Sequence, residues 1–172
     1  MNDTFLPGNG FDTYEEQDRV LMGLSGSVRS GVAVRILQQQ GFAVAAAVVR
    51  LADTPEEHAA AEAAKALAKK LDVECLALNA EALAGQDVDA ARFAALLTAA
   101  DKLGIQYVAS GHYARMETDT QGVSHLFPPE SGAPDESSRL AALSPEVLAR
   151  LILPLGDFAP EDVEDMAKDF KL

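Results

Sequence analysis

A segment rich in serine and glycine, Ser25 to Gly31, has the residue types and the position for phosphate chemistry. It follows a short apolar run, Arg19 to Leu24, and precedes apolar residues at helical spacing. A loop between a strand and a helix presents backbone N–H groups and a helix N-terminus, which together favour an anion. The alternative is a tight turn that needs small residues only for close packing. The residues by themselves leave both interpretations open.

The remaining candidates for chemistry are few. His112 is a general base by residue type, but it can equally shape the turn after Gly111 or contact a ligand. His58 and His125 lack the spacing of metal ligands, so we expect no metal site. We also expect no Ser/His/Asp arrangement and no catalytic pair of carboxylates. Cys75 lies in the middle of an expected strand, which favours a buried structural cysteine.

Alternating strands and helices position these residues. The segment from Thr54 begins a helix, with Thr54 as the cap, Pro55 in the first turn and Glu57 completing a capping box. A small hairpin, an irregular segment over 128–138 and two helices, from Ser144 and from Pro160 to the end, follow the last strand. The expected strands are 19–24, 42–49, 73–78 and 105–110, the helices between them are 32–41, 54–71 and 89–103, and the hairpin strands are 113–116 and 124–127.

Regular alternation of this kind predicts an α/β fold: an open, mostly parallel sheet with helices on both faces and a small hairpin after the fourth strand. Ligands of such sheets bind at the carboxyl ends of the strands, beside the switch point in strand order. A strand order of 3-2-1-4 would place the first and fourth strands side by side. The segments Ser25–Ser30 and Gly111–His112 would then share one crevice.

Length and charge set further bounds. The 172 residues suit one domain, which we expect over 19–172, after a polar acidic leader over 1–18. Fourteen Lys and Arg stand against 27 Asp and Glu, a formal charge of -13, which argues against tRNA binding by this chain alone. No apolar run approaches the roughly 20 residues of a membrane span. The single cysteine excludes an internal disulfide, and we expect a cytoplasmic protein that does not enter a membrane.

The loop resembles that of ATP pyrophosphatases with a PP-loop, whose pattern is SGGxDS. Two positions depart from the pattern: Ser27 replaces the second glycine and Arg29 replaces the acid. Further segments resemble the tRNA-specific 2-thiouridylase (MnmA) family over about residues 19 to 172. The matching residues are Ser25, Gly26, Val28 and Ser30 of the loop, Gly41-Phe42, Ser110-Gly111-His112-Tyr113-Ala114-Arg115 for TGHYAR, Leu143-Ser144-Pro145 for LSxExL, and Leu153-Pro154-Leu155-Gly156 for FPLG.

The resemblance implies a fold like that of adenine nucleotide alpha hydrolases, with ATP or AMP at the loop. In that family's chemistry ATP adenylates a tRNA uridine at the wobble position, and a persulfide on one cysteine then delivers sulfur with the help of a second cysteine. The binding residues that the resemblance implies here are Gly23, Leu24, Ser25, Gly26, Ser27, Val28, Arg29, Ser30, Val49, Gly111 and His112.

Several parts of the family pattern are absent. The family has its nucleophilic cysteine in the segment that corresponds to Ala84–Phe93, and this segment carries no cysteine. Residues 134–140, PDESSRL, correspond to the family's KDQSYFL segment but keep little of its sequence. Arg29 cannot ligate Mg²⁺, so we expect no magnesium-assisted adenylation. The guanidinium can instead bind phosphate directly, or it can be a solvated side chain on a loop that binds nothing.

Three hypotheses follow. In the first, the chain is a pseudoenzyme, a degenerate thiouridylase-like domain that binds an adenine nucleotide or a phosphate but has no catalytic residues of its own. In the second, it is a subunit of a tRNA-uridine sulfurtransferase, and a protein partner supplies the cysteines and the RNA-binding domains. In the third, it is a scaffold protein with an empty crevice.

Overall fold

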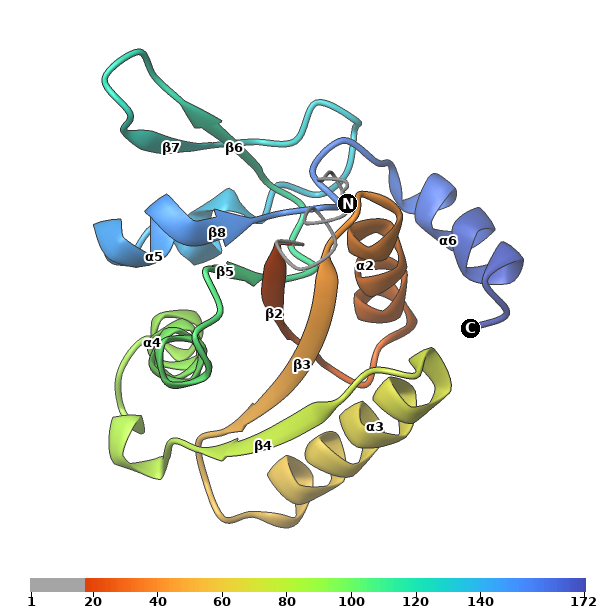
Figure 1. The fold of residues 1–172 in the computed structure, drawn as a ribbon, viewed down its shortest axis with the longest axis vertical. Helices are drawn as coiled ribbons and strands as arrows, with labels where there is room; N and C mark the ends of the chain where they lie inside the picture. The colour runs from red at the N-terminus through yellow and green to blue at the C-terminus, as the bar shows by residue number, and fades with distance from the viewer. Residues whose placement is uncertain (1–17) are drawn as a thin grey trace, which may run out of the picture.

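The computed structural model describes residues 18–172, and the expected leader over 1–18 lies outside that range except for Asp18. Its centre is a five-stranded sheet in which every neighbouring pair is parallel, in the order β4-β3-β2-β5-β8 (Figure 1). The strands are β2 (Arg19–Gly23), β3 (Ala43–Arg50), β4 (Cys75–Asn79), β5 (Tyr107–Ala109) and β8 (Leu151–Ile152). The first four follow the predicted order 3-2-1-4, so the predicted fold class is confirmed.

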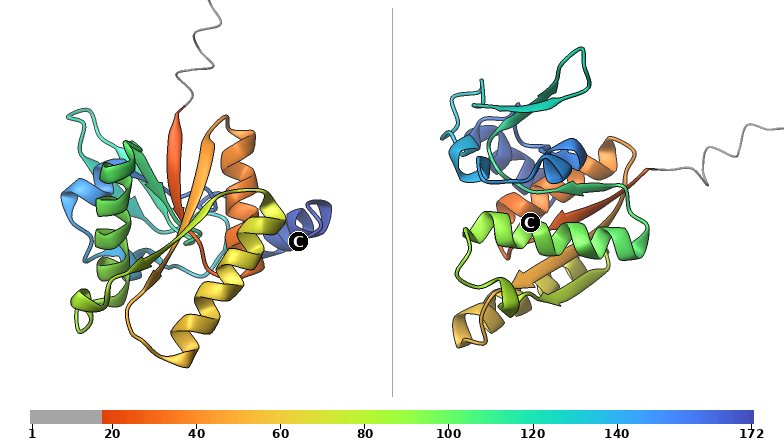
Figure 2. Two further views of the ribbon diagram at one scale, coloured as in Figure 1. Left: turned by 60° about the horizontal axis from the view of Figure 1, so that its bottom comes forward. Right: turned by 90° about the vertical axis from the view of Figure 1, so that its left-hand side faces the viewer.

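Helices cover both faces of this sheet, with α2, α3 and α6 on one side and α4 and α5 on the other (Figure 1, Figure 2). The sequence of β2 shows why: Val20 and Met22 belong to one buried cluster while Leu21 belongs to the other, because successive strand residues face opposite sides. The helices are α2 (Val28–Gln39), α3 (Pro55–Leu71), α4 (Val88–Leu103), α5 (Pro145–Arg150) and α6 (Pro160–Asp169), with short 3-10 turns η1 (Glu81–Leu83) and η2 (Ser137–Leu140).

The ends of the helices follow the local sequence, with one exception. Thr54 caps α3 by accepting the Glu57 N–H, and Gly104 ends α4 with a left-handed φ of 69°, a conformation that glycine adopts without strain. The predicted capping box is wrong. The Glu57 carboxylate accepts the N–H of Leu51 at 2.8 Å instead, and so ties the start of α3 to the end of β3.

The region after β5 departs most from the prediction. The hairpin strands are β6 (Arg115–Thr118) and β7 (Ser124–Phe127), so the first begins two residues later than predicted (Figure 1). The segment predicted as irregular over 128–138 ends in η2. Strand β8 was not predicted, because two residues directly after a six-residue helix carry no readable periodicity.

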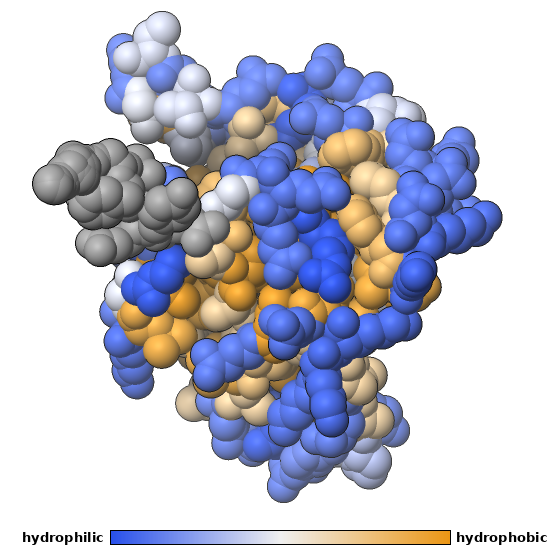
Figure 3. Space-filling model, turned by 45° about the vertical axis from the view of Figure 1, so that its right-hand side comes forward, coloured by the Kyte–Doolittle hydropathy of each residue, from blue (hydrophilic) through white to orange (hydrophobic). Residues whose placement is uncertain are grey.

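The predicted position of Cys75 is also wrong. It begins β4 rather than lying in its middle, and β4 is an edge strand, so the side chain is only half-buried against the cluster of α2 and α3. The surface in Figure 3 is mostly hydrophilic, with apolar atoms emerging between the polar ridges. Among residues 18–172, no helix has the length and apolar character required to cross a membrane.

Candidate functional site

One cavity of about 350 Å³ opens at the carboxyl ends of β2, β3 and β5. Ten of the eleven residues that the resemblance implies line it; Val28 does not, because it lies in the first turn of α2 with 47% of its surface exposed. The lining is Gly23, Leu24, Ser25, Gly26, Ser27, Arg29, Ser30, Ala47, Val48, Val49, Glu57, Ala60, Asp89, Arg92, Phe93, Leu96, Ser110, Gly111, His112 and Arg139. The predicted meeting of the serine loop with Gly111 and His112 in one crevice is therefore what the fold produces.

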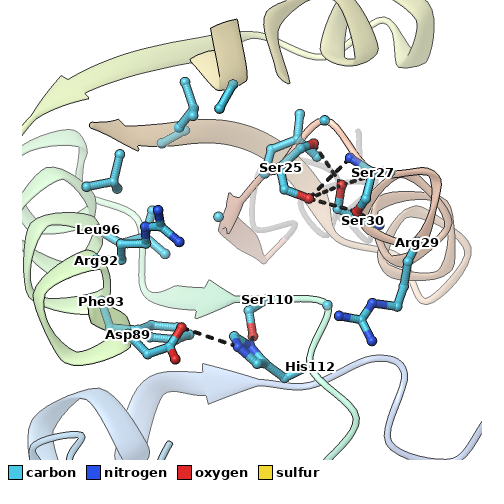
Figure 4. A pocket seen from close by; sticks show the side chains of 18 of the residues that line it. Ser25, Ser27, Arg29, Ser30, Asp89, Arg92, Phe93, Leu96, Ser110 and His112 are labelled. Atoms are coloured by element: carbon cyan, nitrogen blue, oxygen red, sulfur yellow. Dashed lines mark hydrogen bonds and ion pairs between the residues drawn. The ribbon is translucent and has the colours of Figure 1, made fainter. Parts of the chain in front are cut away.

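Three serines form the wall of the cavity at the N-terminus of α2 (Figure 4). Ser27 is the cap of α2, and its side chain accepts the Ser30 N–H at 3.3 Å. The Ser30 hydroxyl lies 2.9 Å from the Ser25 carbonyl oxygen and 2.8 Å from that of Ser27. The Ser25 and Ser27 hydroxyls lie 2.7 Å apart. The loop is thus held by its own hydroxyls beside the positive end of the helix dipole.

Gly26 brings this loop into close contact with α3. A Cβ atom at position 26 would lie 2.6 Å from the Ala63 Cβ, well inside van der Waals contact. The residue is therefore required by packing, whichever ligand the loop binds. This close approach fixes the distance between the serine wall and α3, which contributes Glu57 and Ala60 to the lining.

Arg29 neither points freely into solvent nor lies unpaired at the loop. Its guanidinium lies 3.3 Å from the Glu136 carboxylate and 4.6 Å from the centroid of the Tyr113 ring. Glu136 also accepts the Tyr113 N–H at 2.8 Å, so one carboxylate connects the start of α2 with the segment after β5. Burial raises the pKa of Tyr113, opposed by the nearby Arg29. Arg29 thus lines the cavity while it holds an internal ion pair.

Two further arginines that line the cavity were not predicted from the sequence. Arg92 on α4 lies 3.7 Å from Glu57, and Arg139 on η2 lies 3.2 Å from Asp89. Asp89 and Arg92 are three residues apart on α4, which places both on one face of that helix. That spacing could have indicated that Arg92 accompanies Asp89 at the cavity. Nothing in the sequence indicates Arg139, because it lies in the segment 134–140, where the family pattern is poorly kept.

The expectation that the chain holds no Ser/His/Asp arrangement is wrong. The Ser110 hydroxyl lies 2.6 Å from Nδ1 of His112, and Nε2 of the same ring lies 3.5 Å from the Asp89 carboxylate (Figure 4). Burial lowers the pKa of His112, while the nearby Asp89 raises it. Ser110 and His112 are neighbours in sequence, but Asp89 reaches them only because α4 packs beside β5.

The titratable residues elsewhere do not form a metal centre. Within residues 18–172 no group of three His, Cys, Asp or Glu side chains is arranged to hold a metal ion. His58 pairs with Asp53 and His125 with Asp119, all in exposed positions. The cavity's own carboxylates, Glu57 and Asp89, face arginines rather than each other, which does not fit a divalent cation.

Cys75 does not contribute to the cavity lining. Burial raises the pKa of its thiol, so the nucleophilic thiolate is disfavoured at neutral pH. Neither its position nor its environment is that of a sulfur carrier for the cavity.

Comparison with solved structures supports the fold. The chain is similar to the predicted subunit of tRNA methyltransferase from Methanocaldococcus jannaschii, with a TM-score of 0.53, 16% identity, and coverage of 88% of this chain and 76% of that one. It is also similar to the U34-tRNA thiolase NcsA from Methanococcus maripaludis, with a TM-score of 0.61, 15% identity, and coverage of 90% and 57%. At these identities the likeness concerns the fold alone.

Sequence comparison goes further. The chain is 30% identical to the tRNA-specific 2-thiouridylase MnmA of Pediococcus pentosaceus and 32% identical to that of Yersinia pestis, in each case over 184 aligned residues and 91% of this chain. It spans about half, 49%, of the length of these relatives. The model of the family described as the tRNA methyl transferase HUP domain matches residues 18–89 and 88–172. The resemblance inferred from the loop and the SGHYAR segment is thereby confirmed, and the chain belongs to this tRNA methyl transferase HUP domain family.

Proposed function

We propose that the chain is a degenerate PP-loop domain, similar to the tRNA 2-thiouridylases, that binds an adenine nucleotide or a phosphate group without metal and does not thiolate RNA by itself. The observation that carries this proposal is the meeting of the serine loop and three arginines at one cavity. Its volume of about 350 Å³ is within the range of small-ligand sites. Its proposed place of action is the cytoplasm.

The phosphate end of the proposed ligand lies against the loop. The first turn of α2 offers backbone N–H groups, and the dipole of the helix favours an anion there. Ser25 and Ser27 present hydroxyls that can exchange their mutual hydrogen bond for one to a phosphate oxygen. The apolar part of the lining, which includes Val49 and Leu96, suits the flat face of a base.

Arginines replace the charge that a metal ion would supply. Arg29, Arg92 and Arg139 approach the cavity from α2, α4 and η2, and each keeps at least a third of its side chain exposed. Guanidinium groups bind phosphate oxygens through paired hydrogen bonds, so no divalent cation is needed. An arriving phosphate would compete with Glu136, Glu57 and Asp89 for these cations.

Thiolation by this chain alone is excluded from the proposal because no suitable cysteine is available. The chain has a single cysteine, Cys75, and its half-buried thiol lies outside the cavity lining. Sulfur transfer through a persulfide requires a reactive thiolate beside the activated uridine. The proposed function is therefore ligand binding.

Titration calorimetry tests this proposal. AMP, ATP and pyrophosphate are each titrated into the full chain in buffer containing EDTA, and then with excess Mg²⁺. We expect binding of at least one of them in EDTA, with little gain from Mg²⁺. Absence of heat for all three ligands under both conditions would refute the proposal.

A second candidate function is that of a subunit. In this candidate a partner protein supplies the cysteines and the RNA-binding surface, and the chain itself corresponds to about half the length of its MnmA relatives. The complex would release pyrophosphate from ATP when tRNA is present. A complex recovered from its native source that releases no pyrophosphate with tRNA and ATP would exclude this role.

The Arg29–Glu136 ion pair favours a third candidate, the scaffold, because this arginine already has an internal anion. A crystal of the protein grown with ATP separates the binding module from the scaffold. Electron density over Ser25 to Ser30 indicates the binding module, and an empty loop with Arg29 still on Glu136 indicates the scaffold.

A further inference from the structure

Three polar side chains are in contact between the end of β5 and the start of α4: Ser110 with His112, and His112 with Asp89. We propose that Ser110, His112 and Asp89 form a nucleophilic serine site that acts on small carboxylic esters. This inference goes beyond the proposed function: the trio needs no nucleotide to react, although it lies in the same cavity and shares Asp89 and Arg139 with the proposed phosphate site.

The distances fit a serine, a base and an orienting carboxylate. The Ser110 hydroxyl lies 2.6 Å from Nδ1 of His112, within hydrogen-bond range, and Nε2 on the other side of the ring lies 3.5 Å from Asp89. With the ring proton on Nε2, Nδ1 accepts the hydroxyl proton of Ser110. The familiar triad uses the two nitrogens the other way round. Here Nδ1 faces the serine because the two residues are only two positions apart on the same strand end.

Burial gives the trio the conditions for such chemistry. Ser110 is 6% exposed, and the side chains of His112 and Asp89 are 13% and 14% exposed. The Phe93 ring lies 6.1 Å from the imidazole, centroid to centroid, and shields one of its sides. Desolvation lowers the pKa of His112, so the imidazole is neutral and can accept a proton at neutral pH.

The surroundings hold Asp89 in place. Its carboxylate accepts hydrogen bonds from Arg139 at 3.2 and 3.4 Å, which fixes the orientation of the carboxylate relative to His112. Arg92 reaches into the same cavity from α4 (Figure 4) and provides positive charge for a developing oxyanion. The trio, Phe93 and the two arginines all line this one cavity.

The reaction begins as the Ser110 oxygen attacks the ester carbonyl carbon while its proton passes to Nδ1 of His112. The tetrahedral intermediate collapses, the bond from carbon to the alcohol oxygen breaks, and the leaving alkoxide takes the proton from Nδ1. Water then repeats the sequence on the acyl-serine, giving the carboxylic acid and restoring Ser110. The overall reaction consumes one ester and one water.

A fluorophosphonate probe tests this assignment, because it forms an Oγ–P bond with an activated serine and releases fluoride. The full chain is incubated with the probe at pH 7.5 and the labelled peptide is identified by mass spectrometry. We expect covalent labelling at Ser110, together with turnover of p-nitrophenyl acetate. An unlabelled chain, or labelling confined to other serines, would overturn the proposal.

Variants separate a reactive site from a merely structural hydrogen bond at the end of the strand. Ser110→Ala should abolish labelling, and His112→Asn should slow it by about 100-fold, the scale of general-base catalysis. Asp89→Asn should also slow labelling, because the amide no longer holds the imidazole in the tautomer with its proton on Nε2. Ser124→Ala, in the hairpin away from the cavity, is the matched control and should label like the original chain. If His112→Asn labels as fast as the control, the imidazole has no role and the proposal fails.

Discussion

The guanidinium of Arg29 is paired with the carboxylate of Glu136, 107 residues further along the chain, and lies over the Tyr113 ring. The pair joins the first turn of α2 to the segment before η2. It places a negative charge beside the cation that we propose for phosphate binding. If Arg29 binds phosphate as proposed, the strength of that pair controls how readily the loop accepts an anion.

Glu136→Gln should strengthen ATP binding in EDTA by about tenfold, equivalent to roughly 1.4 kcal/mol, because the competing carboxylate is removed. Glutamine keeps an oxygen that can accept the Tyr113 N–H, so the segment after β5 remains anchored. Calorimetry measures the change, and Glu62→Gln on the exposed face of α3 is the control. Unchanged affinity in Glu136→Gln would show that Arg29 does not bind the phosphate.

Arg92→Gln should weaken binding of ATP by about tenfold and binding of AMP by less, because a longer phosphate chain meets more of the arginines. A hydrogen bond to a charged group is worth about 1.5–3 kcal/mol, which sets this scale. The same calorimetric series provides the ratio of the two affinities. Lys65→Gln, an exposed change on α3, serves as the comparison, and equal losses for AMP and ATP would contradict the prediction.

Gly26→Ala should displace the loop, because the new Cβ would meet Ala63 at 2.6 Å. We expect a loss of about 1–3 kcal/mol in the free energy of unfolding, typical of overpacking, and loss of nucleotide binding. Urea denaturation measures the first effect and calorimetry the second. The double variant Gly26→Ala with Ala63→Gly removes the clash and should regain binding. If it does not, the glycine is required for a reason other than this contact.

Acidification should reduce stability through His112. Its pKa is lowered in the folded state, chiefly by burial, so the unfolded chain binds the proton more readily. The stability contributed by the neutral ring is present above the unfolded pKa of about 6.5 and is lost progressively as the pH falls towards the lower folded value. Urea midpoints at pH 7.5 and 5.5 should differ less in His112→Asn than in the original chain. Thr98→Ala, an exposed change without a titratable group, should leave the difference unchanged.

Much of the framework follows from local sequence. The apolar run of β2, the cap at Thr54 and the left-handed glycine at Gly104 each obey rules that operate within a few residues. The serine loop and the SGHYAR segment identified the family. The rules for parallel sheets also predicted the crevice, because they place the first and fourth strands side by side and the ligand at their carboxyl ends. Strand β8 escaped prediction because two residues are too short to show a pattern.

The residues that only the tertiary structure could add are those brought together over long distances in the chain. Nothing near Arg29 in the sequence indicates Glu136, and nothing near His112 indicates Asp89, because ion pairs and hydrogen bonds of this kind depend on how helices pack against the sheet. The sequence by itself determined the fold class, the position of the serine loop and the presence of a single cysteine. Packing decided which charges face the cavity, since Arg29, Arg92 and Arg139 each pair with a carboxylate from another part of the chain.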